Sequence, residues 1–258
     1  MSDLEVQAVP GSVPASPGLS QVQRVISTFT APSKTFEDIK RGNKSWWLPF
    51  VITLLSFAVF FGVVSTKVTW PTVYENEQRN APEFAKRMLE QAPPDRRAAQ
   101  AKAGPMTQAV TAAISPIGVI IIDLIAAGVL LATINFGFGG NASFGSLFAV
   151  TLYAGLVLWP LRWLLAAGAT LLIDPETFSI NNPAPTNIGA FFPGLKASSL
   201  LLYSFLTALD APTLWCMFIT AIGVATVAGV KRSAGYIAVF GWWFIGLLIG
   251  VGIAAAFS

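Results

Sequence analysis

The fold of this chain is decided by three consecutive segments: Ile114–Phe136 (ISPIGVIIIDLIAAGVLLATINF), Gly137–Ser143 (GFGGNAS) and Phe144–Ile173 (FGSLFAVTLYAGLVLWPLRWLLAAGATLLI). The first and third segments are apolar, and each is near or above the ~20 residues that a helix needs to cross ~30 Å of hydrocarbon. The middle segment carries no charge and is rich in glycine. The pattern predicts a hairpin of two membrane-spanning helices.

Each apolar run contains a charged residue, Asp123 in the first and Arg162 in the second. Counted outward from the turn at ~1.5 Å per residue, the two charges lie at similar depth, with Arg162 the farther from the turn. A charge at mid-bilayer costs roughly 2.5–3.5 kcal/mol, so it needs a partner or an aqueous cavity. Three interpretations stay open: an ion pair that fixes the hairpin register, which we favour, an Arg162 that extends to the membrane surface alone, or a substrate or ion pathway.

The composition of the whole chain agrees with a membrane protein. Hydrophobic residues make up 54% of the 258 residues and charged residues only 11%, whereas soluble proteins carry about a quarter charged residues. The formal net charge of +3 fits basic residues beside membrane spans and gives no reason to expect nucleic acid as a partner. The lipid bilayer is therefore the first expected partner.

Further apolar runs complete an all-α, polytopic transmembrane bundle with short interfacial amphipathic helices. The five predicted spans are residues 47–64, 114–136, 147–173, 213–230 and 235–256. Pro160 predicts a kink inside the third span, because proline lacks the backbone N–H that a helix needs there. Residues 198–209 are apolar but short, so they either cross the membrane or lie in its interface.

The remaining segments are polar. Residues 1–20 are rich in proline, glycine and serine and predict a disordered tail, so the transmembrane domain is expected over residues 21–258. Residues 66–108 mix acids and bases and predict a solvated, partly helical loop.

A short amphipathic element is expected before the first span. Val22–Phe29 has an apolar face, and Thr35-Phe36-Glu37-Asp38 has the form of a capping box that opens a helix ending near Lys40. Basic residues surround this element, so we expect it to lie on the membrane surface. Trp46 and Trp47 at the start of the first span and Trp70 beyond its far end are typical of interface anchors.

Basic residues also predict the orientation of the chain. The first span is preceded by Lys34, Lys40, Arg41 and Lys44, and the turn between the last two spans contains Lys231 and Arg232. With five spans these groups lie on one side, so the positive-inside rule places the N-terminus in the cytoplasm and the C-terminus outside a cell (inner or plasma) membrane.

Small residues recur at the spacing that allows helices to approach closely. They are Gly246, Gly250 and Ala254 in the fifth span and Ala221, Ala225 and Gly229 in the fourth. We expect these two spans to pack on each other, with dimerisation through the same face as the open alternative.

The sequence excludes several kinds of chemistry. It has no histidine, which removes His-ligated metals, His-based nucleophilic catalysis and His proton relays, and its one cysteine, Cys216, lies in an apolar run. No metalloprotease, serine-hydrolase or phosphate-loop motif is present. We therefore expect no enzyme activity, no metal and no cofactor.

Three stretches resemble a known family. Ala31-Pro-Ser-Lys-Thr-Phe-Glu-Asp-Ile39, followed by Trp46-Trp47-Leu48-Pro49, is similar to the opening of the Yip domain. Leu209-Asp210, Leu214-Trp215 and Ile222-Gly223 are similar to its fourth span. Tyr153 with Pro160 resembles the spacing in its third span, and five spans agree with the family.

The resemblance implies an integral membrane protein of the Yip (Ypt/Rab-interacting) family, closest to its prokaryotic branch. Eukaryotic members bind Rab-type GTPases and act in vesicle traffic and membrane shaping. No residue of this chain is carried over as a GTPase-binding site. The expected function is a non-enzymatic membrane scaffold or adaptor, with another membrane protein or a second copy as partner. The alternative is a small transporter or channel that uses Asp123 and Arg162.

Overall fold

The computed structural model describes residues 18–192 and 194–256. Within these ranges the elements are helices, and the only pairing outside them is an isolated bridge between Asn187 and Asp210. The all-α prediction is confirmed. Most of the predicted tail, residues 1–17, lies outside the described residues, whereas Gly18–Ser20 lead directly into the first helix.

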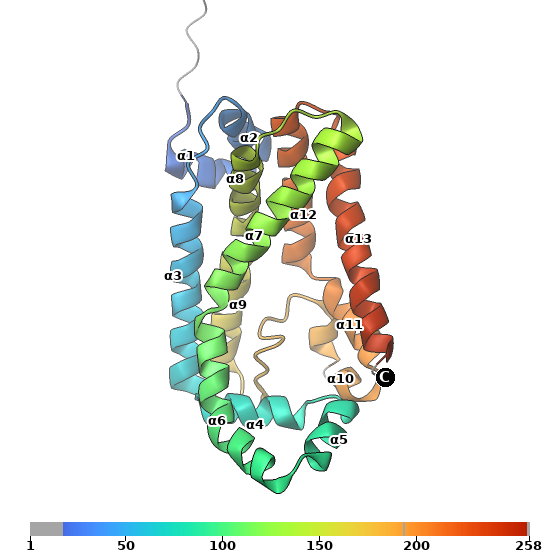
Figure 1. Cartoon of the computed structure of the whole chain (residues 1–258). Helices are drawn as coiled ribbons and strands as arrows, with labels where there is room; N and C mark the ends of the chain where they lie inside the picture. Colours follow the sequence, from blue (N-terminus) through green and yellow to red (C-terminus); the bar gives the residue numbers. More distant parts are fainter. Residues whose placement is uncertain (1–17, 193, 257–258) are drawn as a thin grey trace, which may run out of the picture.

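Five helices are long and apolar enough to cross a membrane. They are α3 (Trp47–Val63) with its π-helical extension Val64–Val68, α7 (Ser115–Ala132) with Thr133–Gly137, α8 (Phe144–Ala154) with α9 (Trp159–Leu172), α12 (Ala211–Ala228) and α13 (Arg232–Ala256). Each predicted span coincides with one of them to within a few residues. The chain is therefore built as a five-span bundle (Figure 1).

The third span is interrupted as Pro160 predicted. Helix α8 ends at Ala154, a 3-10 turn covers Gly155–Val157, and α9 begins at Trp159. Pro160 occupies the first turn of α9, where its missing N–H has no intrahelical acceptor to serve. The two halves of this span can thus pack against different neighbours.

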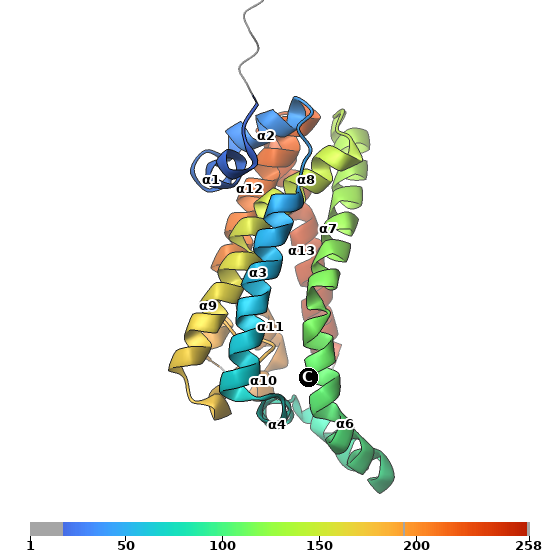
Figure 2. The same ribbon diagram turned by 90° about the vertical axis from the view of Figure 1, so that its left-hand side faces the viewer.

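Short helices cover both ends of the bundle. At one end, α1 (Gln21–Thr30) and α2 (Pro32–Lys40) lie beside the α7–α8 and α12–α13 turns, as Figures 1 and 2 show. We call this the α1–α2 end. The opposite end, here the α4–α6 end, holds the other α-helices that are not part of a span. These are α4 (Trp70–Arg79), α5 (Glu83–Gln91), α6 (Pro94–Ala113), α10 (Leu195–Ser198) and α11 (Leu200–Ala208).

The structure also describes residues 66–108, predicted to be partly helical, and residues 198–209, predicted either to cross the membrane or to lie in its interface. The predicted polar loop, residues 66–108, is helical along most of its length. Helix α11 has only nine residues, or about 14 Å at 1.5 Å per residue, which is too short to cross a bilayer.

Helix α8 is the centre of the bundle. All of its residues from Ser146 onward, and the 3-10 turn through Val157, are buried, which is the pattern of a helix enclosed on every side. It packs against α7, α12 and α2, while α9 packs mainly against α3. This exchange of neighbours at the break decides where the charges of the hairpin lie.

The start of α2 differs from the prediction. Helix α2 begins at Pro32 and has no side-chain cap, so Thr35 lies inside the helix rather than at its N-terminus. The prediction of a capping box at Thr35–Asp38 was wrong because proline at the first position already sets the helical backbone angle. A capping box is present instead at α1, between Ser20 and Gln23.

Candidate functional site

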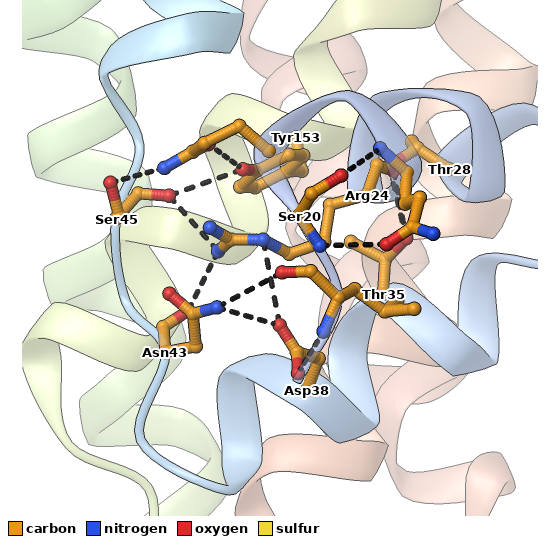
Figure 3. Close-up of polar contacts among 11 residues, drawn as sticks. Ser20, Arg24, Thr28, Thr35, Asp38, Asn43, Ser45 and Tyr153 are labelled. Carbon is orange, nitrogen blue, oxygen red and sulfur yellow. Dashed lines mark hydrogen bonds and ion pairs between the residues drawn. The ribbon is translucent and has the colours of Figure 1, made fainter. Parts of the chain in front are cut away.

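Buried polar side chains join α1, α2 and α8 at the α1–α2 end (Figure 3). Arg24 of α1 and Asp38 of α2 are only 1% and 3% exposed. The Nε atom of Arg24 lies 3.5 Å from Oδ2 of Asp38. A surface helix rarely buries a charge, so this pair connects the two short helices from within.

The guanidinium of Arg24 has further partners on two sides. Its Nη1 donates to the carbonyl oxygens of Asn43 at 2.8 Å and Ser45 at 3.1 Å. Its central carbon lies 5.2 Å from the ring centre of Tyr153 in α8, within the range of a cation–π interaction. Arg24 therefore holds α1 against both the α2–α3 connection and the central helix.

The carboxylate of Asp38 is bonded in the same way. Its Oδ1 accepts the backbone N–H of Leu19 at 3.0 Å, and its Oδ2 accepts the side-chain amide of Asn43 at 3.0 Å. A buried charge is tolerated when it is paired and hydrogen-bonded. Asp38 thus ties the segment before α1 to the segment after α2.

Tyr153 fastens this arrangement to the bundle. Its buried ring comes from α8, and its hydroxyl donates to Gln21 Oε1 at 2.6 Å and lies 3.1 Å from the carbonyl oxygen of Ser45. The hydroxyls of Thr28 and Thr35 both donate to the carbonyl of Arg24, at 2.8 and 2.9 Å. We call residues 19–45, held in this way, the α1–α2 platform.

The platform packs closely against the spans α8 and α12. A Cβ atom at Gly223 in α12 would lie 2.6 Å from Val150 and 3.0 Å from the ring of Phe36. Glycine is thus the residue that allows α12 to approach both α8 and α2. Phe36 and Gly223 come from two of the stretches that carry the family resemblance.

The outer side of the platform is amphipathic. Val22, Ile26 and Phe29 of α1 are exposed by 59%, 57% and 40%, and the Phe29 ring packs edge-on against Trp215 of the span α12 at 5.9 Å. The basic residues exposed at the same end are Lys34, Lys40, Arg41, Lys44, Lys231 and Arg232. An apolar strip beside a span, with basic residues around it, fits a helix that lies in the membrane interface.

A second polar cluster fastens the α4–α6 end. Glu77 of α4 accepts hydrogen bonds from Ser179 Oγ at 2.6 Å and from Lys196 Nζ at 3.0 Å, and it also bonds Asn181. Burial raises the pKa of the Glu77 carboxyl, but the hydrogen bond from Ser179 and the charge of Lys196 outweigh burial and hold the pKa below its ordinary value. This cluster ties α4 to the segment between α9 and α11.

The structure does not bring Asp123 and Arg162 together. Asp123 is 7% exposed, its Oδ2 has no hydrogen-bond partner among the described residues, and it lines a cavity of about 220 Å³. Arg162 lines an adjoining cavity of about 450 Å³, which shares Ile122 and Trp159 with the first. The predicted ion pair is therefore not formed within the described part of the chain. The reason is the break after α8, since α7 packs on α8 while α9 packs on α3.

The small residues of the last two spans have different neighbours from those expected. Helices α12 and α13 do pack on each other, but the close approach is at Gly235, whose Cβ would collide with the carbonyl of Ala221 and reach Ala225. Gly246 and Gly250 line a groove of about 510 Å³ shared with α11 instead.

The two other members of these predicted small-residue faces also have separate positions. Gly229, with a φ angle of +71°, ends α12, where a left-handed residue satisfies the last carbonyls. Ala254 is buried in α13.

The predicted anchors lie at the two ends of α3. Trp46 and Trp47 are 37% and 55% exposed at its start. Trp70 lies beyond its π-helical extension, where its indole N–H donates to Ser65 Oγ at 3.1 Å. Their contact with the membrane interface stays a prediction.

The Arg24 network was missed at the level of sequence. One signal was present: Arg24 is the only charged residue in α1, whose other residues are apolar or uncharged. Two of its partners, Asp38 and Tyr153, belong to stretches quoted for the family resemblance. That the three residues meet depends on tertiary packing.

Comparison with known proteins covers the region just described. A family model, that of the Yip1 domain, matches residues 26–254, which includes the second half of α1, all of α2 and the five spans up to Ala254. No curated protein and no solved structure matches the chain.

Proposed function

The chain belongs to the Yip1 domain family, and on this basis we propose that it is a non-enzymatic scaffold or adaptor of the membrane whose contact surface is the α1–α2 platform. It is a multi-pass integral membrane protein by its family and its five apolar helices.

The Arg24–Asp38–Tyr153 network is the observation that carries the proposal. It fixes two short helices to the central helix through buried contacts. A surface held in one conformation pays less ordering entropy on binding than a flexible tail does. A pre-organised platform on an otherwise lipid-embedded protein is suited to present a surface to a partner.

The charge of the two ends supports an orientation. The α1–α2 end exposes six basic residues, whereas the α4–α6 end mixes acids and bases in similar number. By the positive-inside rule this charge difference favours a protein of the cell membrane with its platform in the cytoplasm and its C-terminus outside. The six basic residues around the platform favour contact with anionic lipid headgroups. We propose that the partner bound there is a membrane protein or a second copy of this chain.

Photo-crosslinking in native membranes tests the proposal. A photoreactive residue at Lys40 reports on the platform, and one at Glu90 of α5 is the matched control on the opposite end. We expect a discrete protein adduct from Lys40 that weakens when Arg24→Met loosens the platform, and none from Glu90. Adducts from Glu90 alone, or Lys40 adducts unaffected by Arg24→Met, would contradict the proposal.

One observation favours a second candidate, a small transporter or channel. The Oδ2 atom of Asp123 has no hydrogen-bond partner among the described residues and lies beside a cavity within the spans, and buried charges beside broken helices are typical of transport sites. Arg162, the other residue of that alternative, lines the adjoining cavity and forms no ion pair with Asp123 among the described residues. Flux of a solute or ion into liposomes that disappears with Asp123→Asn would support transport over scaffolding.

A further inference from the structure

The cavity at Asp123 is enclosed by four of the membrane-spanning segments. It lies between α7, the end of α8 with its 3-10 turn, α12 and α13, and has a volume of about 220 Å³. The Asp123 side chain is only 7% exposed, and its Oδ2 has no hydrogen-bond partner in the described part of the chain. An acceptor left unsatisfied in such surroundings costs free energy, so a ligand that supplies a donor or a positive charge gains by binding there.

The carboxylate of Asp123 and the hydroxyl oxygens of Thr151 and Thr220 are suited to accept from a ligand in this cavity. The hydroxyls of Thr151 and Thr220 donate hydrogen bonds to the backbone carbonyls of Phe148 and Cys216, at 2.9 and 2.8 Å. Their oxygen lone pairs remain available. No lysine or arginine of the described residues lines this cavity, so its chemistry is that of a site for a cation.

The rest of the lining selects an organic cation over a metal ion. Ca²⁺ and Mg²⁺ take about six or more oxygen ligands, and the side chains here offer one carboxylate and two hydroxyls. Trp159 and Trp242 also line the cavity, and indole rings attract ammonium groups. The remaining lining is aliphatic and suits the apolar body of a ligand.

Two residues that line the cavity are exposed on the surface of the spans. Ile122 of α7 and Trp242 of α13 line it and are 55% and 46% exposed, and both belong to spans. We propose that this cavity is a binding site for an amphiphilic amine, with its ammonium group against Asp123 and its apolar body among the aliphatic and tryptophan side chains.

The test compares two small probes on the full chain in lipid nanodiscs. Phenethylammonium carries the charge, and 2-phenylethanol is its neutral counterpart of similar size. We expect saturable quenching of tryptophan fluorescence by phenethylammonium, with an affinity at least about tenfold higher than that of the alcohol.

Three variants locate the binding. Asp123→Asn removes the charge with little change in shape and abolishes the preference for the ammonium probe. Ala126→Leu keeps Asp123 but fills the cavity that Ala126 lines, and it abolishes binding of both probes. Lys231→Gln, exposed in the turn at the α1–α2 end, leaves both affinities unchanged.

Two results would overturn the proposal: equal affinity of the native chain for the two probes, or a preference for the ammonium that survives both Asp123→Asn and Ala126→Leu. A thermal melting midpoint recorded for each variant shows whether it is folded. If Asp123→Asn does not fold, the response of Ala126→Leu decides.

Discussion

Asp38 and Asp123 are both buried carboxylates, exposed by 3% and 7%, but their surroundings differ. Asp38 pairs with the guanidinium of Arg24 and accepts hydrogen bonds from a backbone N–H and a side-chain amide. Asp123 has an Oδ2 atom that finds no partner in residues 18–192 and 194–256, and a cavity lies beside it.

This difference separates structure from binding capacity. A carboxylate whose acceptors are all used holds the fold together and has nothing to offer a ligand. A carboxylate that keeps an unused acceptor next to a cavity weakens the fold slightly and can receive a ligand. Burial alone does not distinguish the two roles, because the bonds at the oxygen atoms decide.

The largest expected effect is at the paired site. Arg24→Met keeps much of the side-chain volume but leaves Asp38 buried without its cation, and we expect a loss of about 3–5 kcal/mol in the free energy of unfolding. Titration with a denaturing detergent measures it. Lys34→Met, an exposed change on α2, is the control and should stay within about 0.5 kcal/mol of the native chain. Equal stability of both variants would remove the structural role of Arg24.

An added methyl group should cost more stability at the α1–α2 platform than near Asp123. Gly223→Ala places a methyl group against Phe36 and Val150 beneath the platform, and overpacking of this kind costs about 1–3 kcal/mol. Gly118→Ala, on the helix of Asp123, meets open space and should be neutral or stabilise by up to about 1 kcal/mol. Melting midpoints of the two variants compare the regions directly, and a reversed order would be inconsistent with the described packing.

A smaller effect, of opposite sign, is expected at the unpaired site. Asp123→Asn removes a carboxylate whose burial is not fully compensated, so the free energy of unfolding should stay the same or rise by up to about 1 kcal/mol. The same detergent titration applies. A loss of more than about 2 kcal/mol would mean that Asp123 has a structural partner, and the contrast with Asp38 would fail.

The smallest effect concerns pH at the α4–α6 end. The pKa of Glu77 is lower in the folded chain than its ordinary value of 4.5. Its contribution to stability is therefore complete above that ordinary value and is lost as the pH falls through the lowered pKa of the folded state. Melting midpoints of the native chain should fall on acidification, and Glu77→Gln should reduce this fall. An identical acid response in both proteins would exclude Glu77 as its source.

The fold was largely predictable because membrane spans are local features of sequence. Each apolar run has the length that the bilayer requires, and Pro160 acts on its own helix, so the five spans and the break after α8 follow without knowledge of the packing.

The candidate sites were less predictable because they depend on which helices become neighbours. Asp123 and Arg162 were expected to meet, but α9 packs on α3 after the break. Spacing of small residues indicated Gly246 and Gly250, although Gly235 makes the close approach. Arg24 could not be connected to Tyr153, 129 positions later in the chain, from local patterns.

A double-mutant cycle tests the central claim most directly, namely that the α1–α2 platform is held by a buried pair. Arg24→Met, Asp38→Asn and the double variant are compared by detergent titration, beside a second cycle of Asp123→Asn and Arg162→Gln. We predict that the first double variant loses at least about 1 kcal/mol less than the sum of its single variants, and that the second cycle is additive. Additivity in the first cycle, or strong coupling in the second, would contradict the account.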